Sequence, residues 1–381
     1  MNKKRIFIVA GELSGDLLGS KIVHILKKNY PEILIEGVCG FHMKNAGCTP
    51  LYSIESFSLL GIFELIWKLP LILILRYKIL RHLKLNRPDL YIGVDFPEFN
   101  LSVQKILKKN RVPVIHFVSP KIWAWREYRI RKIKLYTDCI FSIFPFEINI
   151  YKKYKHKCVF IGHPLANIIP IEKISSEIYK RRLGYKNTTL IISLFPGSRY
   201  QEVLKMLPIF LKSILLLKNK GYLFETTLSI ASKSLFPFID KYKLDIIALH
   251  IKVVYKNPHL SLKVCDIALV TCGTIALEAM LFKRSMVVCY KVSKLTSIIL
   301  KKMIKISFFS LPNIIFKKKL VSELIQSECN PEKCSKQLEK LINRDYYKNI
   351  NLIQKFTKIH KSLIVEGFPN KILVEVNKFL S

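Results

Sequence analysis

The sequence is poor in acidic residues. Its 381 residues include 27 Asp and Glu against 63 Lys and Arg, a formal net charge of +36. This shortage excludes an acidic solvating protein and favours anionic partners, such as nucleic acid, a phospholipid surface or a phosphorylated substrate, without choosing among them. Because the excess is spread widely and accompanies heavy use of Ile and Lys, a compositional drift of the genome would also produce it. The charge is therefore a weak clue.

Several motifs for metals and cofactors are also missing. The nine cysteines include no C-x-x-C pair, and several, such as Cys139, lie in apolar runs. This usage is typical of a reducing compartment, where buried Cys acts as a small hydrophobic residue, and it suggests neither a zinc nor a disulfide framework. The absence of G-x-G-x-x-G argues against a nicotinamide cofactor. No Asp-x-Asp and no His/carboxylate cluster with metal spacing appears, so a required metal is not indicated.

Long uninterrupted hydrophobic runs are absent. The apolar run 6–10 stops at Gly11, as expected of a strand entering a polar loop rather than of a signal peptide. Residues 59–75 are the one membrane-like stretch, but charged residues interrupt it and Pro70 breaks it, whereas a spanning helix needs about 20 apolar residues. With Trp67 and a basic flank, the stretch fits an interfacial membrane contact and a core helix with a solvated basic end equally well.

The remaining pattern is an alternation of apolar strands and helix-like segments. Strands are predicted over residues 5–10, 33–39, 90–94, 112–118 and 139–144, and again over 190–195, 225–231, 250–254, 267–270 and 286–289. Such alternation predicts an α/β fold with doubly wound parallel sheets, whose ligands bind at the carboxyl ends of the strands. A polar helical linker over 172–182 places a domain boundary near 165–185. We expect two Rossmann-like domains facing a central cleft, a favoured place for ligands.

The second domain carries two candidate anion sites. Strand 190–195 leads into Pro196-Gly197-Ser198-Arg199 and a helix near Glu202, and strand 267–270 leads into Gly273-Thr274 and a second helix. Glycine lets backbone N–H groups approach an anion, Arg199 can add a bidentate contact, and Glu278 could hold ribose hydroxyls. Each motif alone is often only a helix cap. Together they favour a nucleoside diphosphate.

The first domain offers a candidate base. Asp95 follows the buried strand 90–94, so partial desolvation should raise its pKa, as a general base needs. Asp95 or Asn100 could instead cap the next helix, and for Asn100 we prefer the cap. The small-residue loop 11–16 could admit a ligand closely.

Three further residues have open interpretations. Trp123, beside Lys and Arg, could bind a sugar face or a lipid phosphate, or could anchor its loop to the core. We expect His116 to be a core histidine, and for His163 a hinge role and a ligand role are equally open.

Taken in order, the motifs resemble the lipid-A-disaccharide synthases, bacterial glycosyltransferases of lipid A assembly. The resemblance covers nearly the whole chain and is carried by residues 9–16, 61–64, 93–100, 118–126, 144–147, 160–164, 196–199, 273–278 and 310–313. It departs at Gly40-Phe41-His42-Met43, where the family tends to have Gly-Pro-Arg-Met, and at Tyr200-Gln201, which replaces small residues.

The resemblance implies a GT-B type fold and an inverting reaction. Family members join UDP-2,3-diacylglucosamine to 2,3-diacylglucosamine 1-phosphate (lipid X), giving UDP and a β-1,6-linked disaccharide, without a metal or other cofactor. An acceptor-binding domain is expected over 1–170, completed by a C-terminal helix within 350–381, and a UDP-sugar-binding domain over 171–349. We expect a cytoplasmic enzyme, peripheral on the inner face of the inner membrane through residues 59–75, with the oligomeric state, a homodimer included, left open.

The resemblance also assigns residue roles. Asp95 matches the family's essential carboxylate and Arg199 its donor-side arginine. The acceptor side is expected to include Glu12, Ser14, Asp16, Asn100, Ser119 and Trp123. The donor side is expected to include Gly197, Ser198, Glu202, Gly273, Thr274, Glu278 and Asn313.

Two alternative functions compete with this one. Another UDP-sugar transferase or epimerase of the same fold would share the anion turns, although the segment 59–75 favours a lipid acceptor. A basic nucleic-acid-binding protein would explain the charge, but not the two anion turns or the acid at a strand end.

Overall fold

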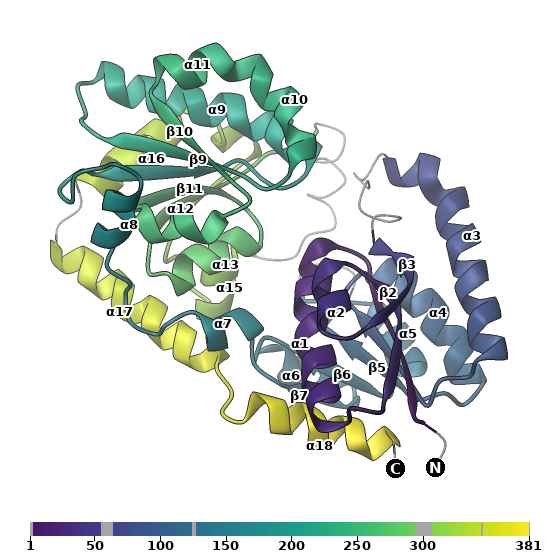
Figure 1. The fold of residues 1–381 in the computed structure, drawn as a ribbon. Coiled ribbons are helices and arrows are strands. Elements are labelled where there is room, and N and C mark those ends of the chain that lie inside the picture. Colours follow the sequence, from purple (N-terminus) through teal and green to yellow (C-terminus); the bar gives the residue numbers. More distant parts are fainter. Residues whose placement is uncertain (1–2, 55–63, 124–126, 294–306, 344–345, 381) are drawn as a thin grey trace. The chain divides into compact units, whose positions relative to one another are not determined.

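The computed structural model describes residues 3–54, 64–123, 127–293, 307–343 and 346–380. The chain divides into two compact units, Met1–Asn167 with Leu363–Ser381, and Ile168–Ser362. Figure 1 shows both units, with most of their elements labelled. Part of the membrane-like segment (residues 59–63 and the side chains of 64–69, Trp67 among them) and residues 124–126 lie outside what is described.

The first unit is built on a parallel sheet with the order β3-β2-β1-β4-β5-β6-β7. Its strands are β1 (Arg5–Ala10), β2 (Leu34–Cys39), β3 (Thr49–Ser53), β4 (Leu90–Val94), β5 (Val114–Phe117), β6 (Cys139–Ser142) and β7 (Cys158–Phe160). The sequence did not predict the edge strands β3 and β7. Neither is a buried apolar run, since β3 contains Pro50 and is largely exposed and β7 has three half-buried residues.

Helices cover this sheet. They are α1 (Leu13–Asn29), α2 (Phe41–Asn45), α3 (Glu64–Leu85), α4 (Pro97–Lys109), α5 (Arg129–Tyr136), α6 (Glu147–Lys153), α7 (Pro164–Ile168) at the unit boundary and the C-terminal α18 (Phe368–Leu380). The chain returns to the first unit at Leu363, and α18 contacts α1, where the Tyr30 hydroxyl donates to Asn377 Oδ1 at 2.7 Å. The expectation that Pro70 breaks its segment is wrong, because α3 continues through it. A proline costs one backbone hydrogen bond there.

The second unit is built on a parallel sheet with the order β10-β9-β8-β11-β12-β13. Its strands are β8 (Ile191–Phe195), β9 (Glu225–Ile230), β10 (Ile251–Tyr255), β11 (Ile267–Thr271), β12 (Ser285–Tyr290) and β13 (Ser322–Ile325). Its helices are α8 (Glu177–Arg182), α9 (Tyr200–Asn219), α10 (Phe236–Ile239), α11 (Lys243–Ala248), α12 (Pro258–Val264), α13 (Thr274–Leu281), α15 (Leu311–Phe316), α16 (Pro331–Ile342) and α17 (Tyr346–Leu363). The core includes buried side chains of α9, α16 and the central strands.

Each sheet reverses its strand order at one point. In the first unit the reversal lies between β1 and β4, and in the second it lies between β8 and β11. In open parallel sheets, the loops at such a reversal diverge to opposite faces and leave room for a ligand at the carboxyl edge. The predicted doubly wound α/β class is confirmed. The predicted loops that begin at Gly11, Asp95, Pro196 and Cys272 follow the strands at these two reversals.

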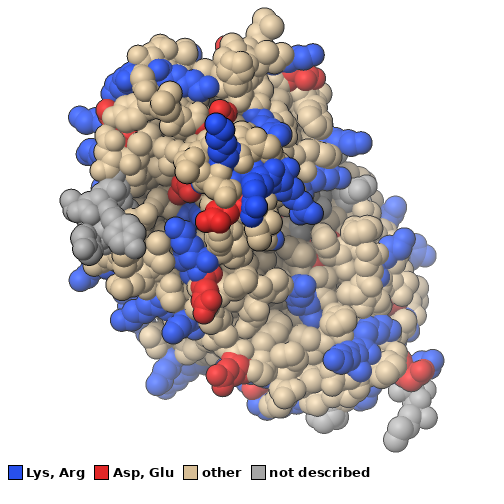
Figure 2. Space-filling view, turned by 60° about the vertical axis from the view of Figure 1, so that its left-hand side comes forward, with Lys and Arg blue, Asp and Glu red and all other residues tan. Residues whose placement is uncertain are grey.

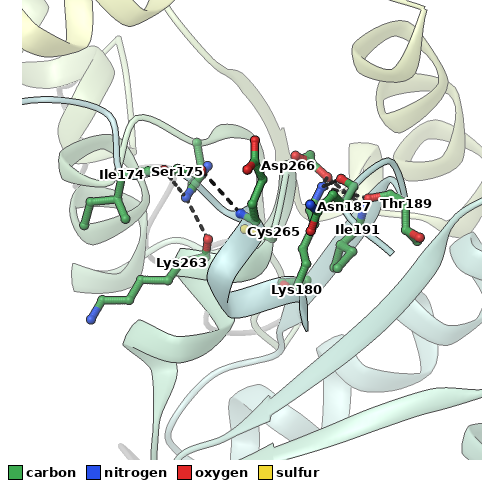
Figure 3. A network of polar contacts seen from close by, with 12 residues as sticks. Ile174, Ser175, Lys180, Asn187, Thr189, Ile191, Lys263, Cys265 and Asp266 are labelled. Carbon is green, nitrogen blue, oxygen red and sulfur yellow. Dashed lines mark hydrogen bonds and ion pairs between the residues drawn. The ribbon is translucent and has the colours of Figure 1, made fainter. Parts of the chain in front are cut away.

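An ion pair with a buried lysine holds the segment before β8 against the sheet of the second unit. Only Glu177–Arg182 of the expected helix 172–182 is helical. Lys180 Nζ lies 2.8 Å from Asp266 Oδ2 and donates to the Thr189 carbonyl at 2.8 Å, and the same Asp266 oxygen accepts from the Ile191 N–H at 2.9 Å (Figure 3). The Lys180 side chain is only 5% exposed. Nearby, the buried Arg284 donates to the carbonyls of Leu262, Lys263 and Ile174.

Replacing Lys180 by Met should therefore destabilise the second unit. Lys180→Met keeps most of the apolar stem but leaves a carboxylate and a buried carbonyl without their cation, so the free energy of unfolding should fall by about 1–3 kcal/mol. Urea denaturation followed by circular dichroism measures the loss as a lower midpoint. Lys333→Met is the control, because its pair with Glu328 is exposed and worth about 0–1 kcal/mol. Equal losses in the two variants would contradict the assignment.

Candidate functional site

Asp95 lies directly after β4, in a strained turn. Its N–H donates to the Phe117 carbonyl at 2.8 Å, and both Asp95 and Phe96 have left-handed backbones, with φ of 50° and 46°. Non-glycine residues adopt this region at a cost that tends to be found at functional sites. Gly11, after the neighbouring β1, makes room for the turn, because a Cβ there would come within 2.4 Å of the Phe96 ring.

Asn100 holds this turn rather than capping the helix. Helix α4 begins at Pro97 with Phe96 at its N-cap, so the cap that we preferred for Asn100 is wrong. The Asn100 side chain is fully buried, donates to the Asp95 carbonyl at 2.7 Å and accepts from the Tyr91 hydroxyl at 2.7 Å. It therefore fixes the backbone of Asp95.

Two loops and the first turn of α4 bring charge to the Asp95 carboxyl. Burial raises its pKa above the ordinary value, the positive charge of Lys121 opposes this rise, and the negative charges of Glu12 and Glu98 add to it. Glu12 comes from the loop after β1, and Lys121 from the loop after β5. The sequence-predicted Glu12 and Asp95 are thus close enough to interact. Lys121 was not among the predicted site residues, although it follows Ser119 at the end of the next strand.

Asp16 supports a neighbouring turn. Its fully buried carboxylate accepts from the N–H groups of Gly40, His42 and Met43 at 2.7, 2.9 and 3.2 Å, which caps α2. The turn that departs from the family pattern is therefore held from α1, whose first turn also carries the half-buried Ser14.

Ser119 and Trp123 are both tied to α6. Ser119 Oγ lies 2.9 Å from the Tyr151 hydroxyl, and Trp123 Nε1 donates to Glu147 Oε1 at 3.0 Å. Glu147 lies in the family motif 144–147, but the sequence predicts no role for it.

The two histidines take different places. His116 is a core residue, as expected, since burial lowers its pKa to about 3 and its Nδ1 lies 2.9 Å from Gln104 Nε2. His163 is buried, and its N–H donates to the carbonyl of Leu363, where the chain returns to the first unit.

The turn after β8 is organised by Glu202. Gly197 has a left-handed φ of 121°, and a Cβ there would come within 2.6 Å of the Glu202 side chain. Glu202 Oε2 accepts from the N–H groups of Ser198 and Arg199 at 3.2 and 3.4 Å, forming a capping box at the start of α9. An incoming phosphate must displace this carboxylate or bind through the Arg199 guanidinium, whose side chain is 53% exposed.

The turn after β11 lies beside it and is open. Gly273 and Thr274 are exposed at the start of α13, and a Cβ on Gly273 would meet no atom within 4 Å. Glu278 Oε2 lies 2.9 Å from Nε2 of His259, on α12. No sequence motif signalled His259.

Two further residues complete this edge. Tyr290 ends β12, and its pKa is raised by burial and by the negative charge of Glu202, while the positive charge of Arg199 opposes this rise. Asn313 is fully buried and uses its whole hydrogen-bonding capacity within the chain: Nδ2 donates to the Val321 carbonyl and to Glu323, and Oδ1 accepts from two backbone N–H groups. Asn313 can therefore position α15 but has no polar atom left for a ligand.

One cysteine cluster was not visible in the spacing. The sulfur atoms of Cys289, Cys329 and Cys334 lie within 4.8 Å of one another. All three side chains are fully buried in the hydrophobic core of the second unit. In the described part of the chain no fourth His, Cys, Asp or Glu joins them, so the four ligands of a structural zinc site are not present.

One face of the molecule shows how its basic residues are distributed. On the face drawn in Figure 2, Lys and Arg are scattered over most of the surface, with Asp and Glu among them. That face shows no single basic stripe of the kind that follows a nucleic-acid backbone.

Solved structures of low identity show the same fold. A putative UDP-N-acetylglucosamine 2-epimerase from Listeria monocytogenes has a TM-score of 0.68 at 11% identity, covering 99% of this chain and 96% of that one. The glycotransferase of kitacinnamycin has a TM-score of 0.65 at 11% identity and covers both chains completely. These likenesses support two Rossmann-like domains of the GT-B class.

Relatives of much higher identity identify the family. A lipid-A-disaccharide synthase from Francisella philomiragia is 44% identical over 365 residues, 95% of this chain and 96% of the relative. One from Francisella tularensis subsp. novicida is 43% identical over 379 residues, 99% of both chains. The family model described as lipid-A-disaccharide synthetase matches residues 6–367. The chain belongs to the lipid-A-disaccharide synthase family of glycosyltransferases.

Proposed function

We propose that this chain transfers a diacylglucosamine unit from its UDP derivative to the 6-hydroxyl of 2,3-diacylglucosamine 1-phosphate, giving a β-1,6-linked disaccharide and UDP. Family membership supports the reaction. The observation that carries the assignment of residues is the half-buried Asp95, held at the reversal of the first sheet in a strained turn.

Asp95 acts as the general base in this proposal. Burial raises the pKa of its carboxyl, so the carboxylate is a stronger proton acceptor than an exposed aspartate. The positive charge of Lys121 stabilises the ionised form of Asp95. Asp95 takes the proton of the acceptor's 6-hydroxyl while that oxygen attacks the anomeric carbon of the donor, and UDP departs from the opposite face with inversion.

The donor's diphosphate is assigned to the carboxyl edge of the second sheet. The Arg199 guanidinium and the exposed N-terminus of α13 at Gly273 and Thr274 supply positive charge and N–H donors to the departing UDP. Glu278, held by His259, offers an acceptor for ribose hydroxyls.

Asp95→Asn tests the base directly. The amide keeps the volume but accepts no proton, so we expect disaccharide formation to fall at least a thousandfold while UDP affinity stays within twofold. Product is measured by chromatography of the lipid and UDP by calorimetry. Glu98→Gln, which removes an exposed carboxylate one turn away, should retain turnover within threefold. Turnover of Asp95→Asn near that of the parent would remove Asp95 from the role of base.

Arg199→Ala, unlike Asp95→Asn, should weaken the binding of UDP. Losing a charge-assisted contact should weaken UDP binding by about 1.5–3 kcal/mol, roughly 10- to 150-fold in Kd. Arg182→Ala, an exposed arginine on α8 of the same unit, is the control. If UDP binds the Arg199 variant as tightly as the control, the turn after β8 serves only as a helix cap.

We also propose that α3 makes a reversible contact with an anionic membrane surface. Among the described residues, no helix is long and apolar enough to cross a membrane. Within α3, the buried Leu75, Ile79 and Leu83 recur every four residues and pack inward, while Leu73 and Ile74 are about half exposed, at 50% and 51%. The same helix is therefore part of the core and presents apolar groups outward. The outward groups are followed by Arg76, Lys78, Arg81 and Lys84, each worth roughly 1 kcal/mol near an anionic surface.

Leu73→Ser with Ile74→Ser should weaken vesicle binding. The parent should sediment with phosphatidylglycerol vesicles at low salt and be released as salt screens the charges. The double variant should bind at least fivefold more weakly with an unchanged melting temperature, because neither side chain belongs to the buried face. Leu223→Ser, at a 93% exposed leucine of the second unit, is the control. A double variant that stays folded and binds like the parent would exclude α3 as the membrane contact.

A further inference from the structure

A buried carboxyl group lies under the loop that follows β5. Glu147 is the first residue of α6, is 2% exposed and directs its oxygens to Trp123 and Ser142. An unpaired buried carboxylate is costly, so its partners decide which protonation state the fold favours.

The hydrogen-bond count around Ser142 favours the protonated acid. Ser142 Oγ lies within hydrogen-bond distance of Glu147 Oε2 and of the Phe144 carbonyl, at 2.7 Å from the latter, and it accepts from the Phe144 N–H at 3.1 Å. A hydroxyl has one hydrogen, which cannot satisfy both a carboxylate and a carbonyl. If Glu147 carries a proton, it donates to Ser142 Oγ, which then donates to the carbonyl. The other carboxyl oxygen still accepts from Trp123 Nε1.

Helix α6 clamps the loop at two points. Glu147 and Tyr151 are four residues apart and therefore lie on one face of the helix. Tyr151 lies 2.9 Å from Ser119 at the start of the loop, and Glu147 holds Trp123 at its end. Between the two clamps lies Lys121, whose charge acts on Asp95.

We propose that Glu147, in its protonated form, is a positioning residue for the acceptor side: it fixes Trp123 and with it the segment 119–123 beside Asp95, and its ionisation loosens that segment. The link to the acceptor rests on the proposed function. The local switch at Trp123 does not.

The surroundings of Glu147 allow the switch to operate near neutral pH. Burial raises the pKa of Glu147 to about 7, against the lowering effect of its hydrogen bonds to Ser142 and Trp123. The titratable groups that its charge reaches are Tyr151 on α6 and Cys158 on β7, and the pKa of each is raised further from neutrality. His163 lies against Phe144, with ring centroids 5.7 Å apart, and His156 lies against Tyr151, with a pKa lowered to about 4 by burial.

The experiment uses Trp123 as its own reporter. The chain has three tryptophans, so Trp67→Phe with Trp125→Phe leaves Trp123 as the fluorophore. Emission between pH 5 and 9 should change with a midpoint near 7, and adding Glu147→Gln should abolish the transition, because the amide mimics the neutral acid and does not titrate. Glu127→Gln, an exposed acid bonded by Tyr154, should leave the transition in place. A flat parent curve, or a transition that survives in Glu147→Gln, overturns the proposal.

Turnover then tests the link to the acceptor in the chain with all three tryptophans. The ratio of kcat/KM for the acceptor at pH 8.5 to that at pH 6.5 should be at least threefold higher in Glu147→Gln than in the parent, with UDP affinity equal in both. A purely structural role predicts a lower melting temperature with the parent's ratio, and that result would overturn the link. If the parent makes no disaccharide, the proposed function fails while the fluorescence titration still reports on Glu147.

Discussion

Parallel pairing between strands from the two halves of each sheet determines where functional groups can gather. β1 pairs with β4 in the first unit and β8 with β11 in the second. Because the paired strands run in the same direction, the loops that leave them emerge at one edge of the sheet, although they are far apart in the sequence. Glu12 and Asp95 therefore lie at the same edge of the first sheet, and the turns at Arg199 and Thr274 lie at the same edge of the second.

Buried and half-buried polar side chains then hold these loops in place. Asp16 binds three backbone N–H groups of the turn at Gly40, Asn100 binds the carbonyl of Asp95, and Glu323 binds the N–H groups of Phe309 and Ser310 before α15. Each of these side chains satisfies backbone groups that the sheet leaves unpaired, which is what a buried polar group must do to avoid its desolvation cost. Their effect on a ligand is therefore exerted through the loops that they fix.

The sequence predicts the central strands well, because a strand buried on both faces must be a continuous apolar run, as in Leu90–Val94. It misses edge strands such as Ser322–Ile325, which are only partly buried and therefore form no such run. Asp95 can be found because it directly follows a recognisable strand, and Arg199 because it ends a Pro-Gly-Ser-Arg turn between a strand and a helix. Lys121, His259 and Tyr290 cannot, because their importance comes from neighbours 19 to 91 residues away, which only the folded chain brings close. Asn313 shows that a motif position can have its side chain fully hydrogen-bonded within the chain, which the sequence does not reveal.

The half-buried Asp95 and the buried Glu147 need opposite protonation states. Burial raises the pKa of both Asp95 and Glu147, but Asp95 must be ionised to accept a proton, whereas Glu147 holds its loop when protonated. Lys121 favours the charged form of Asp95, while the partners of Glu147 are an indole, two hydroxyls and a backbone group, all of them neutral. The environments therefore separate the two groups in the direction that the chemistry needs. Both groups are in the required state only in the pH interval above the pKa of Asp95 and below that of Glu147. A rise of activity with pH therefore reports on the ionisation of Asp95, and a fall at higher pH reports on the ionisation of Glu147.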